Sequence, residues 1–235
     1  MSTVPTIRLP ARLLRTVRGV ADEVNRVSLS QSVNNLARRV PAGLLYILAP
    51  IPAVWWFYQG LTGGLGPEPI NTLQRLYGLF ALQLLIAGLA VTPLRTYFGV
   101  NLIKFRRAIG VIAFSYVFIH LLVWLVLDIG DLSRIWADIV KRPYITIGMA
   151  GFLILIPLAV TSNNLSVRKL GPVRWRKLHK PVYLAVLLGG VHFVILRKGF
   201  QIEPLLYLAG AAGLLLMRVK WRDLSSRVAR SIGRA

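Results

Sequence analysis

The chain has 235 residues, of which 55% are hydrophobic, and a formal net charge of +21. Its mean hydropathy of +0.61 is too high for an ordinary soluble domain, and a nucleic-acid-binding protein would concentrate its basic residues on a folded soluble surface. Cysteine is absent, which excludes disulfides, thiolate metal sites, iron–sulfur clusters and covalently attached haem. Any redox centre must therefore be held by other ligands.

A basic arm occupies residues 1–41 and contains no continuous apolar core, so it is not a secretory signal peptide. Apolar residues recur between its arginines at helical spacing, which predicts an amphipathic helix on the inner leaflet. A partly disordered basic arm explains the same pattern. The pair Arg38 and Arg39 could indicate a twin-arginine export signal, but the segment that follows is one of several spans, which favours a juxtamembrane anchor.

Six stretches of about 20 mostly apolar residues follow, each long enough to cross roughly 30 Å of hydrocarbon. They lie near residues 42–62, 75–94, 108–127, 144–163, 179–197 and 201–218. The sequence therefore predicts an all-α integral membrane protein, a six-transmembrane-helix bundle over residues 42–218, with a basic tail over 219–235. A very short turn near residues 197–199 predicts that the last two spans form a tight antiparallel pair.

Lysine and arginine are divided unevenly between the joints of this bundle. Most of them lie in the arm, the second joint, the fourth joint and the tail, whereas the odd-numbered joints contain few and hold most of the acids. Cytoplasmic joints retain positive charge. The sequence therefore predicts that both termini are cytoplasmic, and that the odd-numbered joints, including residues 63–73 and 128–143, face the other side, where a partner could dock.

Two histidines lie inside predicted spans at matching depth. His120 is 13 residues beyond Arg107, and His192 is 13 residues beyond His179, which is about 20 Å along a helix in both cases. Two imidazoles at one depth on two parallel-running spans can bind a planar cofactor from both sides. They are predicted to be the axial metal ligands of a b-type haem. The alternatives are hydrogen bonds to a neighbouring helix or a proton relay.

Three further residues are candidates near the predicted cytoplasmic edge. His179 lies two residues before Pro181; it could bind a second haem, contact a quinone or flavin, or cap its own helix. Arg106 and Arg107 could bind flavin phosphate or quinone oxygens. The alternative for both arginines is a positive-inside anchor that touches only lipid headgroups.

Seven short motifs, taken together in their order and spacing, resemble a known family. They are GGLGPEP (63–69), TPLR (92–95), FRRAIGVIAFSYVFIHL (105–121), KRPYITIG (141–148), TSN (161–163), RKLGPVRWRKLHKPVYL (168–184) and GGVHFVIL (189–196). The chain resembles, over roughly residues 42–220, the haem-binding membrane subunits of the bacterial periplasmic protein-methionine-sulfoxide reductase system. This is the MsrQ (YedZ) family, within the ferric-reductase-like transmembrane group.

The resemblance implies a b-type haem in the bacterial inner membrane, FMN as an associated cofactor, and electrons drawn from membrane quinol. These would pass to a periplasmic molybdopterin subunit, MsrP, which reduces methionine sulfoxide in oxidised envelope proteins. His120, His179 and His192 match the family's histidine positions. The first predicted span lacks the histidine that some members carry, so a fourth axial ligand is missing and the number of haems, one or two, stays open.

The sequence thus favours an electron-transfer subunit that leaves substrate reduction to its partner. The first rival is a proton- or ion-coupled transporter that uses the intramembrane histidines as a relay, but the predicted spans contain almost none of the carboxylates that such relays combine with histidine. The second rival is a membrane anchor whose histidines only pack. A ferric reductase working alone would need nicotinamide and flavin domains, for which a chain of this length has no room.

Overall fold

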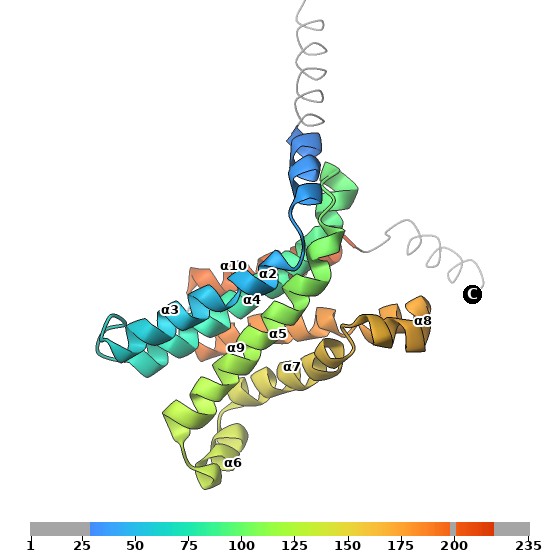
Figure 1. Ribbon diagram of the computed structural model, residues 1–235. Coiled ribbons are helices and arrows are strands. Elements are labelled where there is room, and N and C mark those ends of the chain that lie inside the picture. Colours follow the sequence, from blue (N-terminus) through green and yellow to red (C-terminus); the bar gives the residue numbers. More distant parts are fainter. Residues whose placement is uncertain (1–28, 198–200, 219–235) are drawn as a thin grey trace, which may run out of the picture.

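The computed structural model describes residues 29–197 and 201–218, and every regular element within them is a helix (Figure 1). The predicted tail, most of the predicted arm and the tip of the last turn lie outside the described residues. Residues 29–39 are helical. The later elements are α2 (Leu44–Leu48), α3 (Pro50–Leu61), α4 (Pro69–Phe98), η1 (Ile103–Phe105), α5 (Arg106–Leu122), η2 (Val123–Ile129), α6 (Leu132–Lys141), α7 (Pro143–Val160), α8 (Asn164–Leu178), α9 (Val182–Leu196) and α10 (Ile202–Leu216).

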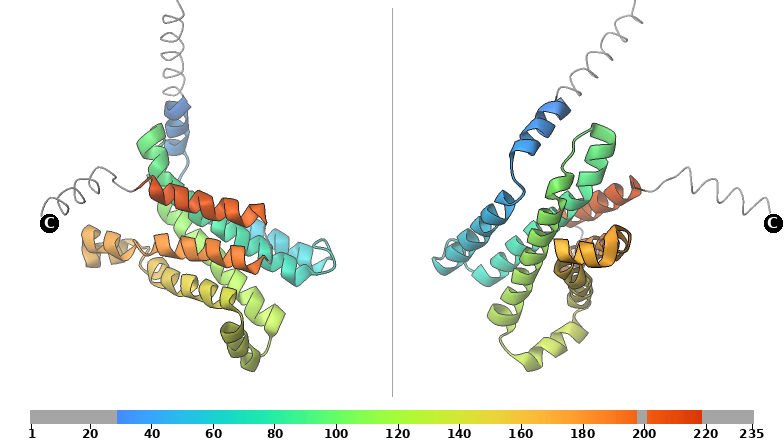
Figure 2. Two further views of the ribbon diagram at one scale, coloured as in Figure 1. Left: turned by 180° about the vertical axis from the view of Figure 1, so that it is seen from behind. Right: turned by 45° about the vertical axis from the view of Figure 1, so that its right-hand side comes forward.

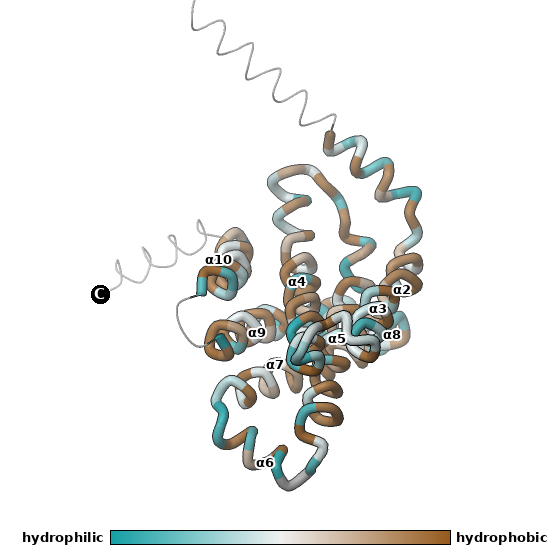
Figure 3. Tube along the Cα trace, turned by 90° about the vertical axis from the view of Figure 1, so that its left-hand side faces the viewer, coloured by the Kyte–Doolittle hydropathy of each residue, from teal (hydrophilic) through white to brown (hydrophobic). Residues whose placement is uncertain are grey.

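Four of the predicted spans correspond to helices long and apolar enough to cross a membrane. These are Leu44–Leu61, Pro69–Phe98, Ile103–Ile129 and Pro143–Val160. A fifth crossing exists if α8 and α9, which meet at a 44° bend, count as one span. The helix at the predicted sixth span, α10, has only 15 residues. In Figure 3 the hydrophobic colour follows the spans, whereas α8 is mostly hydrophilic or intermediate.

The helices pack in pairs around two apolar clusters. Helix α4 lies along α5, α7 lies along α9, and α9 lies along α10 (Figures 1 and 2). One cluster joins α3, α4 and α5 around Tyr77 and Tyr116; the other joins α4, α5, α7, α9 and α10 around Leu89 and Val186. The hydroxyls of Tyr77 and Tyr116 donate to the carbonyls of Ala53 (2.7 Å) and Ala49 (2.6 Å), which fastens the first span to the next two.

Helix α4 is longer than its predicted span, 75–94, at both ends. It begins with a proline at its first turn and continues through Pro93 to Gly99, whose φ of 70° ends it in a left-handed cap. Proline inside a helix lacks the N–H that would bond to the carbonyl four residues earlier, here that of Leu89. Arg218 supplies the missing donor, because its Nη2 donates to the Leu89 carbonyl. The compensation comes from 129 residues away in the chain.

At one end of the bundle, side chains of the connecting segments hydrogen-bond to the backbone of neighbouring segments. Lys104 donates to the carbonyls of Arg38 (3.1 Å) and Val40 (2.7 Å), where the helix over residues 29–39 ends, and the Tyr97 hydroxyl donates to the Met217 carbonyl. A cation at the C-terminal end of a helix is favourable because the exposed carbonyls carry partial negative charge. This end is the one predicted to be cytoplasmic.

The fifth span begins later than its predicted start at residue 179. Helix α8 is interrupted at Gly171, where φ is 73°, and it ends with His179 as its C-cap. Helix α9 begins only at Val182, after Pro181. His179 therefore belongs to the bend between two helices and not to the span itself.

Replacing Arg218 by methionine should leave the Leu89 carbonyl without a partner in an apolar environment. We expect the free energy of unfolding in detergent to fall by about 1–3 kcal/mol. In a Pro93→Ala background, residue 93 regains the N–H that can bond to Leu89, so the same replacement should cost less. Chemical unfolding of the four proteins of this double-mutant cycle is the measurement. Equal costs in the two backgrounds would contradict the assigned role.

Candidate functional site

His120 and His192 line one cavity between α4, α5, α7 and α9. The cavity has a volume of about 590 Å³, which is within the range of roughly 300–1,000 Å³ found for small-molecule and cofactor sites. His120 projects from α5 and His192 from α9, and the centroids of their rings are 6.2 Å apart with the ring planes at 81°. The structure thus brings together the two histidines that the sequence placed at matching depth.

The ring of His120 rests on one turn of α4. Its Nδ1–H donates to the carbonyl of Gln74 at 2.9 Å. Four residues further along α4 stands Gly78, where a Cβ atom would lie 3.1 Å from the His120 ring. The absence of a side chain at this position lets the imidazole lie directly against the helix backbone.

The ring of His192 rests on α7 in the same way. Its Nδ1–H donates to the carbonyl of Tyr144 at 2.6 Å, and Gly148 follows four residues later, where a Cβ would lie only 2.9 Å from Nδ1. A carbonyl can only accept, so the proton of each imidazole is on Nδ1 and the lone pair is on Nε2. Within residues 29–197 and 201–218, neither Nε2 has a hydrogen-bond partner. This is the tautomer of a metal-binding imidazole whose second nitrogen is fixed by a hydrogen bond.

The walls of the cavity are apolar and aromatic. Trp124, Phe152 and Phe193 line it. Phe114 and Phe118 do not line it but stack with Phe152. Gly189 also lines it, whereas Gly190 allows α10 to approach, since a Cβ there would meet Leu208 at 2.9 Å.

One end of the cavity is charged. Three arginines line it, Arg75, Arg142 and Arg197, together with the acids Glu68, Asp128 and Glu203. Arg197 lies 3.8 Å from Glu203, and Arg75 has no ion pair with any described residue. We call these six residues the charged rim.

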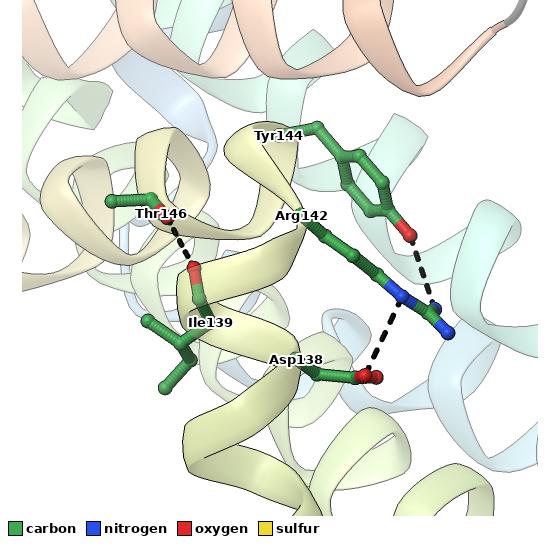
Figure 4. A network of polar contacts seen from close by, with 5 residues as sticks. All are labelled: Asp138, Ile139, Arg142, Tyr144 and Thr146. Carbon is green, nitrogen blue, oxygen red and sulfur yellow. Dashed lines mark hydrogen bonds and ion pairs between the residues drawn. The ribbon is translucent and has the colours of Figure 1, made fainter.

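Arg142 stands at the junction of α6 and α7 (Figure 4). Its guanidinium lies 3.5 Å from Asp138 and donates to the Tyr144 hydroxyl at 3.3 Å. The hydrogen bond to Tyr144, more than the acid, raises the pKa of Arg142. The same junction is tied by a bond from the Thr146 hydroxyl to the Ile139 carbonyl. The rim arginine is therefore permanently charged and held next to the residue whose carbonyl supports His192.

His179 does not line this cavity. Its Nδ1 is 3.0 Å from the Trp175 carbonyl, its Nε2 is 3.1 Å from the Leu158 carbonyl, and its ring stacks on Trp175 at a centroid distance of 3.9 Å. Both nitrogens thus face groups of the protein. Arg107 donates to Asn164 at 2.6 Å, and Arg106 is the first residue of α5; neither lines the cavity.

Comparison with known proteins shows the family to which the chain belongs. Residues 75–190, which include His120 and His179, match the family described as ferric reductase like transmembrane component. The chain is 49% identical over 197 residues to the protein-methionine-sulfoxide reductase heme-binding subunit MsrQ of Agrobacterium fabrum, covering 82% of this chain and 91% of that protein. It is 50% identical over 185 residues to MsrQ of Brucella ovis, covering 78% and 84%. The chain belongs to the MsrQ family.

For this MsrQ-family chain, reasoning from the sequence found the two cavity histidines but missed the residues that support them. Gly78 and Gly148 are two of 20 glycines in the chain, and neither lies next to a histidine in the sequence. The rim arginines carry no signal in the sequence beyond their place at or near the ends of predicted spans.

The contacts of His179 predict a role in stability. His179→Ala removes the polar contacts of the ring and its stack on Trp175, whereas His179→Phe keeps the stack alone. We expect the free energy of unfolding to fall by about 1–3 kcal/mol for the alanine variant and by less for the phenylalanine variant. Unfolding in detergent measures both, and a stability equal to that of the wild type for both variants would show that these contacts are not needed.

Proposed function

We propose that this chain is the membrane electron-transfer subunit of a methionine-sulfoxide reductase and binds a b-type haem between His120 and His192. The observation that carries the proposal is the placement of the two rings in one cavity with both Nδ1–H groups bonded to backbone carbonyls. Each imidazole is thereby left with an unprotonated Nε2 for a metal.

The spacing of the rings fits a single metal ion. In a five-membered ring with bonds of about 1.33 Å, each atom lies about 1.1 Å from the centre. Two opposed imidazoles with metal–nitrogen bonds of about 2.0–2.1 Å, the length known for zinc, then have their centroids about 6.3 Å apart. The distance between His120 and His192 is 6.2 Å.

The polarity of the cavity fits the same ligand. Haem has a flat apolar body and two carboxylates at one edge. The cavity has apolar walls and a charged rim at one end, where Arg75, Arg142 and Arg197 can bind carboxylates. The transporter alternative fits less well, because no described carboxylate is hydrogen-bonded to either imidazole.

A bound b-type haem supplies one-electron transfer. The residues of the chain hold and shield it. The carbonyls of Gln74 and Tyr144 would keep each ligand nitrogen in place, and the apolar and aromatic wall residues would surround the group. Substrate reduction is assigned to a partner, in line with the description of the relatives as heme-binding subunits of a reductase.

The proposal also covers the partner subunit, the electron donor and the orientation of the chain in the membrane. The relatives are named as heme-binding subunits of protein-methionine-sulfoxide reductase, which supports a sulfoxide-reducing partner, MsrP, at the periplasmic side. The charged rim is at the end predicted to be periplasmic. Quinol would deliver electrons at the opposite, basic end, in an inner-membrane protein with six crossings and both termini cytoplasmic. FMN, expected from the family resemblance, would bind near Arg106 and Arg107 at the same basic end.

The first experiment is the dithionite-reduced minus oxidised visible spectrum of the purified protein, with pyridine haemochrome quantification. Wild type should show a b-type signal. His120→Ala and His192→Ala should lose it, because each removes an axial ligand, and His179→Ala should keep it. A fraction lost only in His179→Ala would identify a second haem there. A wild-type protein that stays colourless when made with abundant haem would refute the function and return the histidines to the relay alternative.

The orientation can be tested directly because the chain has no cysteine. Thr62→Cys lies in the first joint and Lys169→Cys in the fourth, and both positions are exposed. In intact cells with a permeable outer membrane, a maleimide that cannot cross the inner membrane should label the first variant and not the second. Inverted inner-membrane vesicles should give the opposite result. Labelling of both variants from one side would contradict the proposed topology.

A further inference from the structure

We propose that Gly78 and Gly148 are positioning residues that hold the planes of the two axial imidazoles crossed, and that this crossing sets the electronic state of the iron between them. The inference rests on the proposed function, since it concerns the haem held by His120 and His192. It adds which residues would determine the electronic state of the iron in that haem.

The first step is that each ring is fixed at two places. An imidazole rotates freely about its outer side-chain bond unless something holds it, because that torsion has only broad preferences. Here the Nδ1–H bond fixes one edge of the ring, and the helix face at the glycine fixes its side. The carbonyl and the glycine are four residues apart in both cases, so one helical turn provides both contacts. We call this pair of contacts the seat of the ring, and its glycine the seat glycine.

The second step is that, among the glycines of α4 and α7, the fit is tight only at these two. A Cβ would lie 3.1 Å from the His120 ring at Gly78 and 2.9 Å from His192 Nδ1 at Gly148. On the same two helices, a Cβ at Gly88 would meet its nearest neighbour at 3.7 Å, and one at Gly151 at 3.6 Å, which are ordinary contacts. Each helix therefore contains one glycine that lies against a histidine ring and one that does not.

The third step is that the two seats are independent. One is on α4 and the other on α7, and the rings they hold meet at 81°. An imidazole splits the energies of the two iron d orbitals that can form π bonds along the axis, and parallel rings add their effects. Crossed rings oppose each other, which leaves the two orbitals nearly equal in energy. Ferric iron in this state gives a low-spin electron paramagnetic resonance (EPR) signal with one very large g value.

The test is the EPR spectrum of the purified ferric holoprotein. Wild type should show the highly anisotropic low-spin signal. In Gly148→Ala and Gly78→Ala the added methyl group forces the ring to turn or tilt, so the largest g value should move towards the ordinary rhombic type with three resolved g values. Gly88→Ala, which is on α4 and does not line the cavity, is the matched control and should give the wild-type spectrum.

Two results would overturn the inference. A rhombic signal from wild-type holoprotein would show that the planes are not crossed, even though haem is bound and the proposed function stands. Wild-type spectra from both seat variants at full haem occupancy would show that the glycines do not position the rings. If Gly148→Ala does not fold, Gly78→Ala, with the milder clash, decides the role of the glycines. Failure of the function itself is recognised separately, because the wild type would then bind no haem.

Discussion

The two intramembrane imidazoles need hydrogen-bond acceptors in a region where the membrane provides no water, and the neighbouring helices offer backbone carbonyls. A polar group without a partner in hydrocarbon is costly, and a helix carbonyl can accept a second bond while keeping its own. His120 must therefore lie against a turn of α4, and His192 against a turn of α7. These contacts bring α4 to α5 and α7 to α9, and the cavity is the space left between the two pairs.

The same constraint explains the ends of the bundle. At three places where proline, a bend or a terminus leaves a carbonyl unbonded, a side chain from elsewhere in the chain supplies the donor. Arg218 serves the carbonyl that Pro93 leaves open, Lys104 serves the end of the helix over residues 29–39, and Trp175 donates to the Thr161 carbonyl after α7. The basic residues that suggest topology in the sequence are thus partly hydrogen-bond donors that hold particular helices together.

Counting along the sequence pointed to the two histidines that the structure places in one cavity, because α5 and α9 are regular helices around them. The count for the fifth span started at His179, which lies in the bend before α9. Counting failed where a distant residue decides the outcome. The carbonyl that Pro93 leaves open in α4 is served by Arg218, 129 residues away, and α8 is interrupted where Gly171 adopts a positive φ. Gly78 and Gly148 could not be recognised, because a glycine that makes room for a ring looks locally like any other glycine in a span.

The charged rim shows how the cavity can accept an anionic ligand without a large rearrangement. Two of its three arginines already have an acidic partner, so binding a further carboxylate at either of them requires an exchange of partners. The pairs involved are weak: Arg142 lies 3.5 Å from Asp138, Arg197 lies 3.8 Å from Glu203, and all four side chains are partly exposed. Exposed ion pairs contribute about 0–1 kcal/mol each. Arg142 and Arg197 can therefore exchange these acids for the carboxylates of a ligand at little cost in free energy. Arg75 has no ion pair among the described residues and needs no exchange.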